Sequence, residues 1–351
     1  MGKNGPVEPT DADWGRWIDM ATSERVLPLL YKIVREGVTG LPREIQEAIS
    51  QTQLDLMTSM VRFEHDLLEV TAILEQGGLR CAVLKGAATA HLDYPDPSLR
   101  QFGDVDLLVA PVHFGRAREL LMAHGWAQAY PLPRHHERFT HAMTFRHGRR
   151  VEVDLHQRIG HRAIGELVPT EHLLHSVVEY DLAGRSLSAL SAPDRLIHAA
   201  LHSMTSRGPY RRLSSAADLI LLTEAQLGEE AAVLSRAQSW KLGSLVQAGI
   251  HAAYHAAQLP IPHGWTNKHV APGRWDSLVE RAYLSDRRRP GYEELAYLRH
   301  LGGWRDRGDY VWGYFSTDAA YEERNRRSGL LDQSRYLWAR LRSGRNERDP
   351  L

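Results

Sequence analysis

Residues 99–111 combine an apolar run with a closely spaced acidic pair, in the order LRQFGDVDLLVAP. The apolar residues at 107–109 are typical of a buried strand, yet Asp104 and Asp106 come directly before them, two positions apart. Successive side chains of a strand point to opposite faces, so the two carboxylates should share one face. Because an unpaired charge near a core is costly, both aspartates should either face solvent or bind a positive group.

Two carboxylates side by side repel each other, which raises the pKa of each unless a cation lies between them. Magnesium is the natural candidate, because it prefers hard oxygen ligands and is often shared with substrate phosphates. The later stretch RRVEVDLHQRI offers a further acid, since Glu152, Asp154 and His156 share one face of a predicted strand. From the residues alone, the third ligand is either Asp154 or Glu152.

The spacing of apolar residues divides the chain into three regions. Helical periodicity dominates 1–78, with one helix over 11–37 and a longer one after Pro42; strands alternate with short helices in 79–190; helices return in 191–351. We therefore predict an α+β fold, in which a small mixed, mostly antiparallel sheet of about four to six strands is flanked by an N-terminal helical pair and a C-terminal helical domain. We expect the ligand cleft between the sheet and the C-terminal helices.

Composition argues against bulk affinity for nucleic acid and against a membrane. The 351 residues carry 43 Lys+Arg and 43 Asp+Glu, so the formal net charge is zero and no global basic field favours a polynucleotide. Cys81 is the only cysteine; it lies in the apolar stretch CAVL, and we expect it in the core. With no signal-peptide core and no run of about 18 apolar residues, we expect a cytoplasmic protein.

The order of these motifs resembles the DNA polymerase β-type nucleotidyltransferase superfamily. In particular it is similar to a branch of uncharacterised bacterial nucleotidyltransferases with LKG…Y…R…DIDLLV…DLH motifs, over roughly residues 75–225. The matching elements here are Leu84-Lys85-Gly86, Tyr94, Arg100, the DVDLLV stretch from Asp104, and Asp154-Leu155-His156. One departure from the superfamily is that Lys85-Gly86-Ala87 stands where Gly-Ser usually follows the first strand.

The resemblance implies an enzyme of the nucleotidyltransferase class. Such an enzyme moves a nucleoside monophosphate, by default AMP, from an NTP to a hydroxyl or phosphate of a small-molecule, sugar or peptide acceptor. The implied cofactor is two Mg²⁺ ions, held by the catalytic residues Asp104, Asp106 and Asp154, with Asp154 preferred over Glu152. An analogy at the level of the fold extends this to natural-product biosynthesis.

The same resemblance implies that Lys85, Gly86 and Arg100 bind the nucleotide. Gly86, at the start of a short helix, would let backbone N–H groups approach phosphate oxygens, while the two cations would neutralise phosphate charge. Two alternatives stay open: Arg100 could instead pair with Asp96 at the surface, and Lys85 could extend its ammonium to solvent.

Several histidines and aromatic residues have less specific patterns. His198 and His202 are spaced as zinc ligands on a helix can be, but packing or contact with a nucleotide base is the favoured interpretation. The histidines at 135, 136, 141 and 147 predict a solvated loop or edge strand, and the Trp and Tyr residues of the C-terminal third predict core positions. Two other functions stay open: a template-independent polymerase or RNA-end modifier, and a catalytically silent nucleotide-binding protein.

Overall fold

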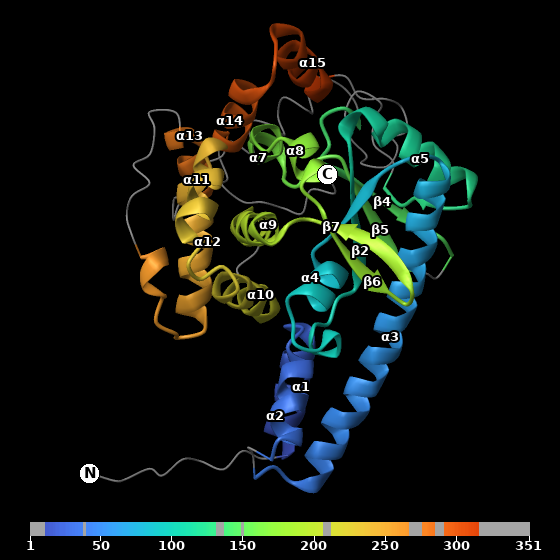
Figure 1. Ribbon diagram of the computed structural model, residues 1–351, viewed down its shortest axis with the longest axis vertical. Helices are drawn as coiled ribbons and strands as arrows, with labels where there is room; N and C mark the ends of the chain where they lie inside the picture. The colour runs from blue at the N-terminus through green and yellow to red at the C-terminus, as the bar shows by residue number, and fades with distance from the viewer. Residues whose placement is uncertain are drawn as a thin grey trace.

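The N-terminal region is an arm of three helices, α1 (Asp11–Ser23), α2 (Leu27–Arg35) and α3 (Arg43–Gln76). Figure 1 shows α1 and α2 beside the lower half of α3. The computed structural model describes residues 11–37, 40–130, 137–148, 151–205, 212–266, 276–284 and 291–315. The prediction of one helix over 11–37 is wrong. The chain turns at Arg25, whose φ is +58°, before Pro28 enters the first turn of α2, where its missing N–H does no harm.

The long helix α3 extends from the arm to the sheet. Its 34 residues span roughly 50 Å at the usual helical rise. Near its start, Ile49 packs with Leu27 and Val34 of the arm, whereas Leu67 and Leu74, in its second half, belong to the core beneath the sheet. One helix thus contributes to two apolar cores.

Among the described residues, seven strands form one sheet in the order β3-β4-β5-β2-β1-β7-β6 (Figure 1). They are β1 (Cys81–Leu84), β2 (Asp104–Val109), β3 (Ala127–Gln128), β4 (Ala142–Arg146), β5 (Glu152–His156), β6 (Val178–Leu182) and β7 (Arg185–Ala189). The pairs β2–β5 and β1–β7 are parallel and the other neighbours antiparallel. The predicted mixed, mostly antiparallel sheet is confirmed. The seven strands exceed the predicted range of four to six.

The sheet separates two apolar cores, and this separation places the acidic pair. Val105 and Leu107 of β2 pack with α3 and with α5 (Phe114–Ala123). Leu108, on the opposite face, packs with helices of the C-terminal region. Asp104 and Asp106 share the face of Leu108 because side chains alternate along a strand. The prediction that the two carboxylates share a face is confirmed, and that face is the one covered by the C-terminal helices.

Short helices connect the strands, and helices make up the rest of the described chain. Between the strands lie α4 (Gly86–Leu92), η1 (Pro97–Leu99), η2 (Pro111–His113), α7 (Arg162–Leu167) and α8 (Thr170–His175). After β7 come α9 (Ala192–Thr205), α10 (Leu213–Glu224), α11 (Glu230–Ser239), α12 (Gly243–Ala256), η3 (His263–Trp265), α13 (Asp276–Tyr283), α14 (Tyr292–His300) and α15 (Trp304–Phe315). The division at 78 and 190 into three domains stays a prediction.

The aromatic residues of the C-terminal third only partly follow the prediction of a core role. Trp265, Tyr283 and Tyr297 are buried, whereas Trp304 is 85% exposed and Trp312 69% exposed. The two exposed tryptophans lie on α15, which stands at the top of the molecule in Figure 1, at the margin of the described helices. None of the described helices is both long and apolar enough to cross a bilayer.

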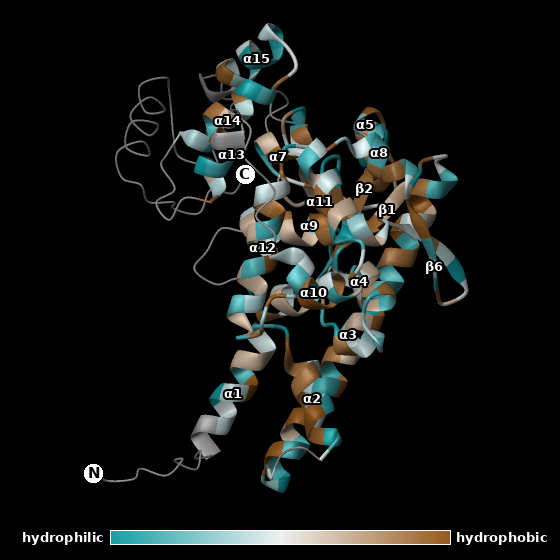
Figure 2. Cartoon of the chain, turned by 60° about the vertical axis from the view of Figure 1, so that its left-hand side comes forward, coloured by the Kyte–Doolittle hydropathy of each residue, from teal (hydrophilic) through white to brown (hydrophobic). Residues whose placement is uncertain are grey.

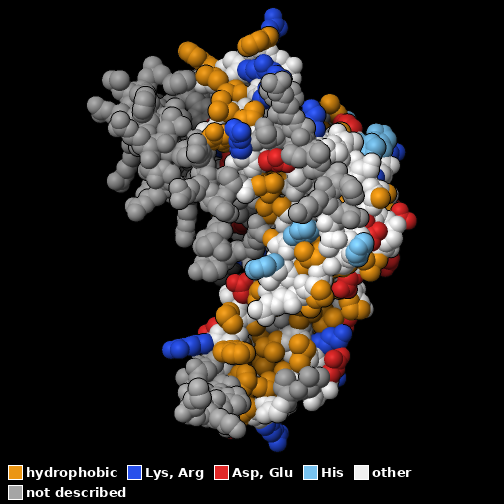
Figure 3. Space-filling model, turned by 90° about the vertical axis from the view of Figure 1, so that its left-hand side faces the viewer, with side chains coloured by type: hydrophobic (Ala, Val, Ile, Leu, Met, Phe, Trp, Pro, Cys, Tyr) orange, Lys and Arg blue, Asp and Glu red, His pale blue; other side chains and the backbone are white. Residues whose placement is uncertain are grey.

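Apolar side chains are also exposed on the N-terminal arm. Trp17 and Met20 of α1, Ile33 of α2 and Leu54 and Val61 of α3 each expose a large part of their side chains. Figure 3 shows apolar side chains gathered at the lower end of the molecule, and Figure 2 shows the strongly hydrophobic colouring of α2. The arm therefore buries its own small core but leaves apolar surface beside it.

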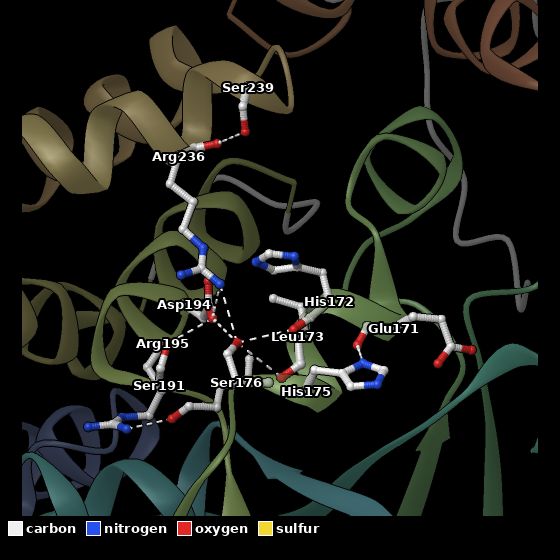
Figure 4. Close-up of polar contacts among 11 residues, drawn as sticks. Glu171, His172, Leu173, His175, Ser176, Ser191, Asp194, Arg195, Arg236 and Ser239 are labelled. Carbon is white, nitrogen blue, oxygen red and sulfur yellow. Dashed lines mark hydrogen bonds and ion pairs between the residues drawn. The ribbon is translucent and has the colours of Figure 1, made fainter.

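A buried carboxylate fixes α9 to the elements around it (Figure 4). Asp194, in the first turn of α9, is fully buried. Its Oδ2 accepts hydrogen bonds from Ser191 Oγ at 2.7 Å, Ser176 Oγ at 3.1 Å and Arg236 Nη2 at 2.8 Å. Ser176 follows α8 and Arg236 belongs to α11. One charged group thus connects three helical segments that are distant in sequence.

Replacing Asp194 with alanine should lower the free energy of unfolding by about 3 kcal/mol, because losing one partner of a buried ion pair leaves the other uncompensated. Urea denaturation at neutral pH measures this. Glu75→Ala is the matched control, since the Glu75–Arg185 pair is largely exposed and its loss should cost about 1 kcal/mol or less. Equal losses in the two variants would contradict the role given to Asp194.

Candidate active site

The parallel pairing of β2 and β5 brings acidic side chains from distant parts of the sequence together. Its register places Asp106 beside Asp154 and Asp104 beside Glu152. Asp106, Asp154 and His156 each offer a ligand atom, and these atoms all lie within 4.8 Å of one another. The strand pairing thus gathers two carboxylates and one imidazole on the face that the C-terminal helices cover.

The buried carboxylate of Asp106 is held by two cationic or polar partners. Lys85 Nζ lies 2.9 Å and His156 Nε2 lies 2.8 Å from Asp106 Oδ1. Burial would raise the pKa of Asp106, but the charge of Lys85 and the hydrogen bond of His156 outweigh it and hold that pKa well below its usual range. Asp106 likewise raises the pKa of Lys85 against the opposing effect of burial. Lys85 therefore supplies a positive group of the kind that the sequence predicted beside Asp104 and Asp106.

Asp154 and Glu152 differ in their surroundings. Asp154 accepts a 2.6 Å hydrogen bond from Thr144 Oγ1, and burial together with the neighbouring Asp106 raises its pKa. Glu152 pairs instead with Arg146 at an exposed position. Asp154 is thus the acid of β5 that lies next to Asp106. Its role as a metal ligand stays a prediction.

The turn between β1 and α4 is strained and tightly packed. Lys85 has a φ of +45°, a region that side chains other than glycine rarely adopt. A Cβ added to Gly86 would lie 2.7 Å from Phe102 Cβ, so only glycine fits there without a shift. Close packing against Phe102 therefore explains why residue 86 is glycine, in addition to the phosphate contact that the sequence predicted.

Arg100 belongs to a buried network with α10. Its Nε and Nη2 donate to the two carboxylate oxygens of Asp218 at 2.6 and 2.7 Å, and its Nη1 donates to the backbone carbonyl of Gln101. Tyr94 Oη donates to the same Asp218 at 2.9 Å. The alternative pairing of Arg100 with Asp96 is wrong, because the fork geometry of Asp218 satisfies the guanidinium more fully.

A cavity of about 440 Å³ lies over the acidic face. Its walls come from β1, α4, β2, α9 and the start of α10, with one residue from the turn between α1 and α2. The cavity lies between the sheet and the C-terminal helices, where the sequence predicted a ligand cleft. The lining residues are Arg25, Val83, Leu84, Lys85, Gly86, Thr89, Arg100, Phe102, Asp104, Asp106, Leu190, Arg195, His198, Ala199, His202, Ser203, Arg212, Ser214, Ser215 and Asp218.

Asp104 lies in this cavity but apart from the carboxylate group around Asp106. Its side chain is 43% exposed, and its Oδ1 is 3.8 Å from Arg25 Nη1. Arg195, Arg25 and Arg212 also line the cavity. Sequence reasoning gave none of them a role in the site, and Arg25 and Arg212 lie far from the DVDLLV strand along the chain. Only the folding of the arm and of α10 brings them near the DVDLLV strand.

Histidines surround the site more closely than the sequence suggested. His198 is buried and lines the cavity with His202; burial lowers the pKa of His198 well below its usual value. His141, predicted as solvated, is half-buried, and its ring lies 3.5 Å from that of His161 and 5.6 Å from that of His156. His147 is half-buried against Trp126, and residues 135 and 136 lie outside the described part of the chain.

Cys81 is packed against the apolar core beneath the sheet, as predicted. Burial raises the pKa of its thiol to about 12. The thiolate is the nucleophilic form of cysteine, so this residue is suited to packing and not to covalent catalysis.

The donor set around Asp106 fits a divalent cation. Asp106 and Asp154 supply carboxylate oxygens, which suit Mg²⁺, and His156 supplies an imidazole within the same 4.8 Å group. His156 Nδ1 is buried and has no hydrogen-bond partner among the described residues. Two carboxylates packed together also explain why one of them, Asp154, has a raised pKa.

The low pKa of Asp106 predicts a stability contribution that depends on pH. A depressed folded-state pKa stabilises the protein above the unfolded-state value and loses that effect as the pH falls through the folded-state value. Asp106→Asn should therefore reduce the free energy of unfolding fully at about pH 7, and the difference from wild type should shrink below about pH 4. Urea titrations across this range measure it, with Glu152→Gln as control. A difference that stays constant down to about pH 3 would contradict the ion pair.

Solved structures that resemble this chain include three proteins of low sequence identity. An antigenic nucleotidyltransferase-like protein from Paracoccidioides brasiliensis is 18% identical, with a TM-score of 0.36 over 56% of this chain and 98% of its own. The lincosamide antibiotic adenylyltransferase LnuA is 12% identical, with a TM-score of 0.31 over 45% and 95%. The antibiotic-resistance factor ANT(2'')-Ia is 15% identical, with a TM-score of 0.36 over 57% and 96%. No curated protein matches the sequence.

The family comparison covers more of the chain. The model of the family described as "Uncharacterised nucleotidyltransferase" matches residues 10–258. This range contains the arm, the whole sheet, every residue that lines the cavity and the helices through α12. The chain therefore belongs to the uncharacterised nucleotidyltransferase family and is a nucleotidyltransferase.

Proposed function

We propose that this protein transfers a nucleoside monophosphate, with AMP as the default group, from an NTP to a hydroxyl or phosphate of a small-molecule, sugar or peptide acceptor. Asp104, Asp106 and Asp154 are the proposed catalytic residues and Mg²⁺ ligands. The observation that carries this proposal is the β2–β5 register, which sets Asp106 beside Asp154 on the face that bears Asp104.

The physical requirements of the reaction fit this arrangement. The acceptor oxygen forms a bond to the α-phosphorus as the bond from that phosphorus to the bridging oxygen breaks, and pyrophosphate leaves. Such displacements need charge neutralisation and in-line positioning more than covalent help from the protein. Magnesium bound at the carboxylates would neutralise phosphate charge and polarise the reacting oxygens.

The protein's own groups have distinct proposed roles around that centre. Lys85 holds Asp106 at 2.9 Å and is the proposed phosphate contact of the β1–α4 turn, together with Gly86. Arg100 has all three nitrogens in hydrogen bonds within the protein. We therefore propose that it acts on the nucleotide mainly by fixing the middle of α10 to the segment that precedes β2, with any phosphate contact secondary.

The size and charge of the site support a small acceptor. The cavity of about 440 Å³ is within the usual range of roughly 300–1,000 Å³ for small-molecule sites. The zero net charge of the chain gives no general attraction for polynucleotides. We also propose a cytoplasmic location, because Cys81 is an unpaired thiol of the kind that reducing compartments preserve.

Substitutions should rank the acidic residues. Asp106→Asn and Asp154→Asn should each lower turnover on the order of a hundredfold or more, because each removes a negative ligand at the reacting phosphates. Glu152→Gln is the control and should change turnover little, since Glu152 makes an exposed pair with Arg146. Pyrophosphate release, with mass detection of the nucleotidylated product, measures this across the four NTPs and a panel of metabolites. An inactive Glu152→Gln beside an active Asp154→Asn would assign the third ligand to Glu152. An RNA 3′ end as the best acceptor would favour the end-modifier alternative.

Metal should be required for activity and should stabilise the nucleotide complex. EDTA should abolish turnover, and Mg²⁺ with ATP at about 100 times Kd should add about 2.7 kcal/mol to the free energy of unfolding. Thermal melting with Mg²⁺ alone, ATP alone and both together measures this. Asp106→Asn should lose most of the combined effect. Full turnover in EDTA would sink the metal-dependent mechanism.

A further inference from the structure

The turn between α1 and α2 docks directly on the helical wall of the cavity. Glu24 accepts a 2.8 Å hydrogen bond through Oε2 from the backbone N–H of Leu213, the first residue of α10. Its backbone carbonyl also accepts from the N–H of Ser214 at 3.2 Å. Glu24 thus satisfies two of the free N–H groups at the start of α10. The docked turn is held where the next residue, Arg25, reaches the cavity.

Arg25 occupies a backbone position that ordinarily favours glycine. Val26 N–H donates to Ala21 carbonyl at 2.8 Å, which closes α1 in the manner of a Schellman motif, and Arg25 lies at the left-handed position with a φ of +58°. A non-glycine residue in this conformation is strained. Strained residues of this kind cluster at functional sites, and Arg25 is held in this conformation at the wall of the cavity.

The Arg25 side chain is aimed at the acidic strand. Its guanidinium lies 3.8 Å from Asp104 Oδ1, beyond hydrogen-bond distance, and a Cβ on Gly103 would come within 3.1 Å of its Nη2. Burial lowers the pKa of Arg25; Asp104 opposes this effect, and the nearby charges of Arg212 and Arg100 add to it. Arg25 is therefore close to Asp104 but is not engaged by it as Arg100 is by Asp218.

The cavity has more positive than negative charge once its internal pairs are counted. Five cationic side chains and three carboxylates line it. Lys85 pairs with Asp106, Arg100 with Asp218, and Arg195 with Asp93 outside the lining. This leaves Arg212, together with Arg25 and its long 3.8 Å contact to Asp104, as the remaining cations of the cavity wall. Among the residues that the structure describes, Arg212 has no carboxylate partner, and its charge repels Arg25.

We infer that Arg25 and Arg212 form a clamp for the polyphosphate of the NTP, so that the N-terminal arm contributes directly to the nucleotide site. This inference rests on the proposed function, since an NTP is the anion that such a transfer would bring to the cavity. Two arginines that repel each other, one of them with only a long 3.8 Å ion pair to Asp104, suit phosphate oxygens, which accept paired N–H donors. A polyphosphate between them would remove the repulsion.

The test compares ligands that differ in the number of phosphates. Calorimetry with Mg²⁺ would measure the affinities of ATP, AMP and tripolyphosphate for wild type, Arg25→Asn, Arg25→Lys and Arg212→Ala. Asparagine is chosen because it tolerates the left-handed backbone. Arg25→Asn and Arg212→Ala should each weaken ATP and tripolyphosphate about tenfold or more and leave AMP nearly unchanged. Arg25→Lys should be intermediate, since lysine keeps the charge without the fork.

Arg16→Asn is the matched control, an exposed arginine of the same arm that lies outside the cavity. It should bind all three ligands as wild type does. Wild-type affinity for ATP and tripolyphosphate in both Arg25→Asn and Arg212→Ala would overturn the clamp, as would equal weakening of AMP. Arg212 is exposed, so its variant tests the inference even if Arg25→Asn fails to fold.

The failure of the clamp is distinguishable from the failure of the proposed function. If Asp106→Asn abolishes nucleotidyl transfer while the arginine variants keep wild-type affinity, the transferase stands and the clamp is overturned. If wild type binds neither ATP nor tripolyphosphate, both are overturned.

Discussion

The architecture of the site depends on how the charge of Asp106 is tolerated in a buried position. Its carboxylate is 4% exposed, and its Oδ1 lies within hydrogen-bond distance of both Lys85 and His156. Without them the desolvation of a carboxylate would cost several kcal/mol. Lys85 directly follows β1 and His156 ends β5, and these two strands are the neighbours of β2 in the sheet. The position of β2 between β1 and β5 therefore also brings Asp106 the two partners that its buried charge requires.

Other buried ion pairs extend this principle to the helices. Arg100–Asp218 connects the chain just before β2 to α10, Arg195–Asp93 connects α9 to the end of α4, and Arg236–Asp194 connects α11 to α9. Buried charges are weak contributors to net stability, but they penalise any arrangement that separates the partners. They therefore define how the helical region is placed over the sheet, and with it the width of the cavity between them.

The sequence predicts the parts of this site that depend on local patterns. The two-residue period places Asp104 and Asp106 on one face of β2. Partners across long sequence separations leave no such pattern. The sequence could not predict that Arg100 pairs with Asp218 and not with Asp96. Nor could it predict that Arg25 lies near Asp104. Both contacts depend on how the helices pack. The break between α1 and α2 was missed because the apolar spacing continues through it.

The left-handed backbones of Arg25 and Lys85 bear on how this protein would respond to engineering. Both residues hold cations at cavity positions where glycine would relax the main chain. A selection for thermal stability alone would favour glycine at either position, since relief of such strain is an easy gain. The same change would remove a positive charge from the cavity. Stability and the proposed ligand recognition are therefore in direct opposition at these two residues, and a consensus or stability-guided redesign should leave them untouched.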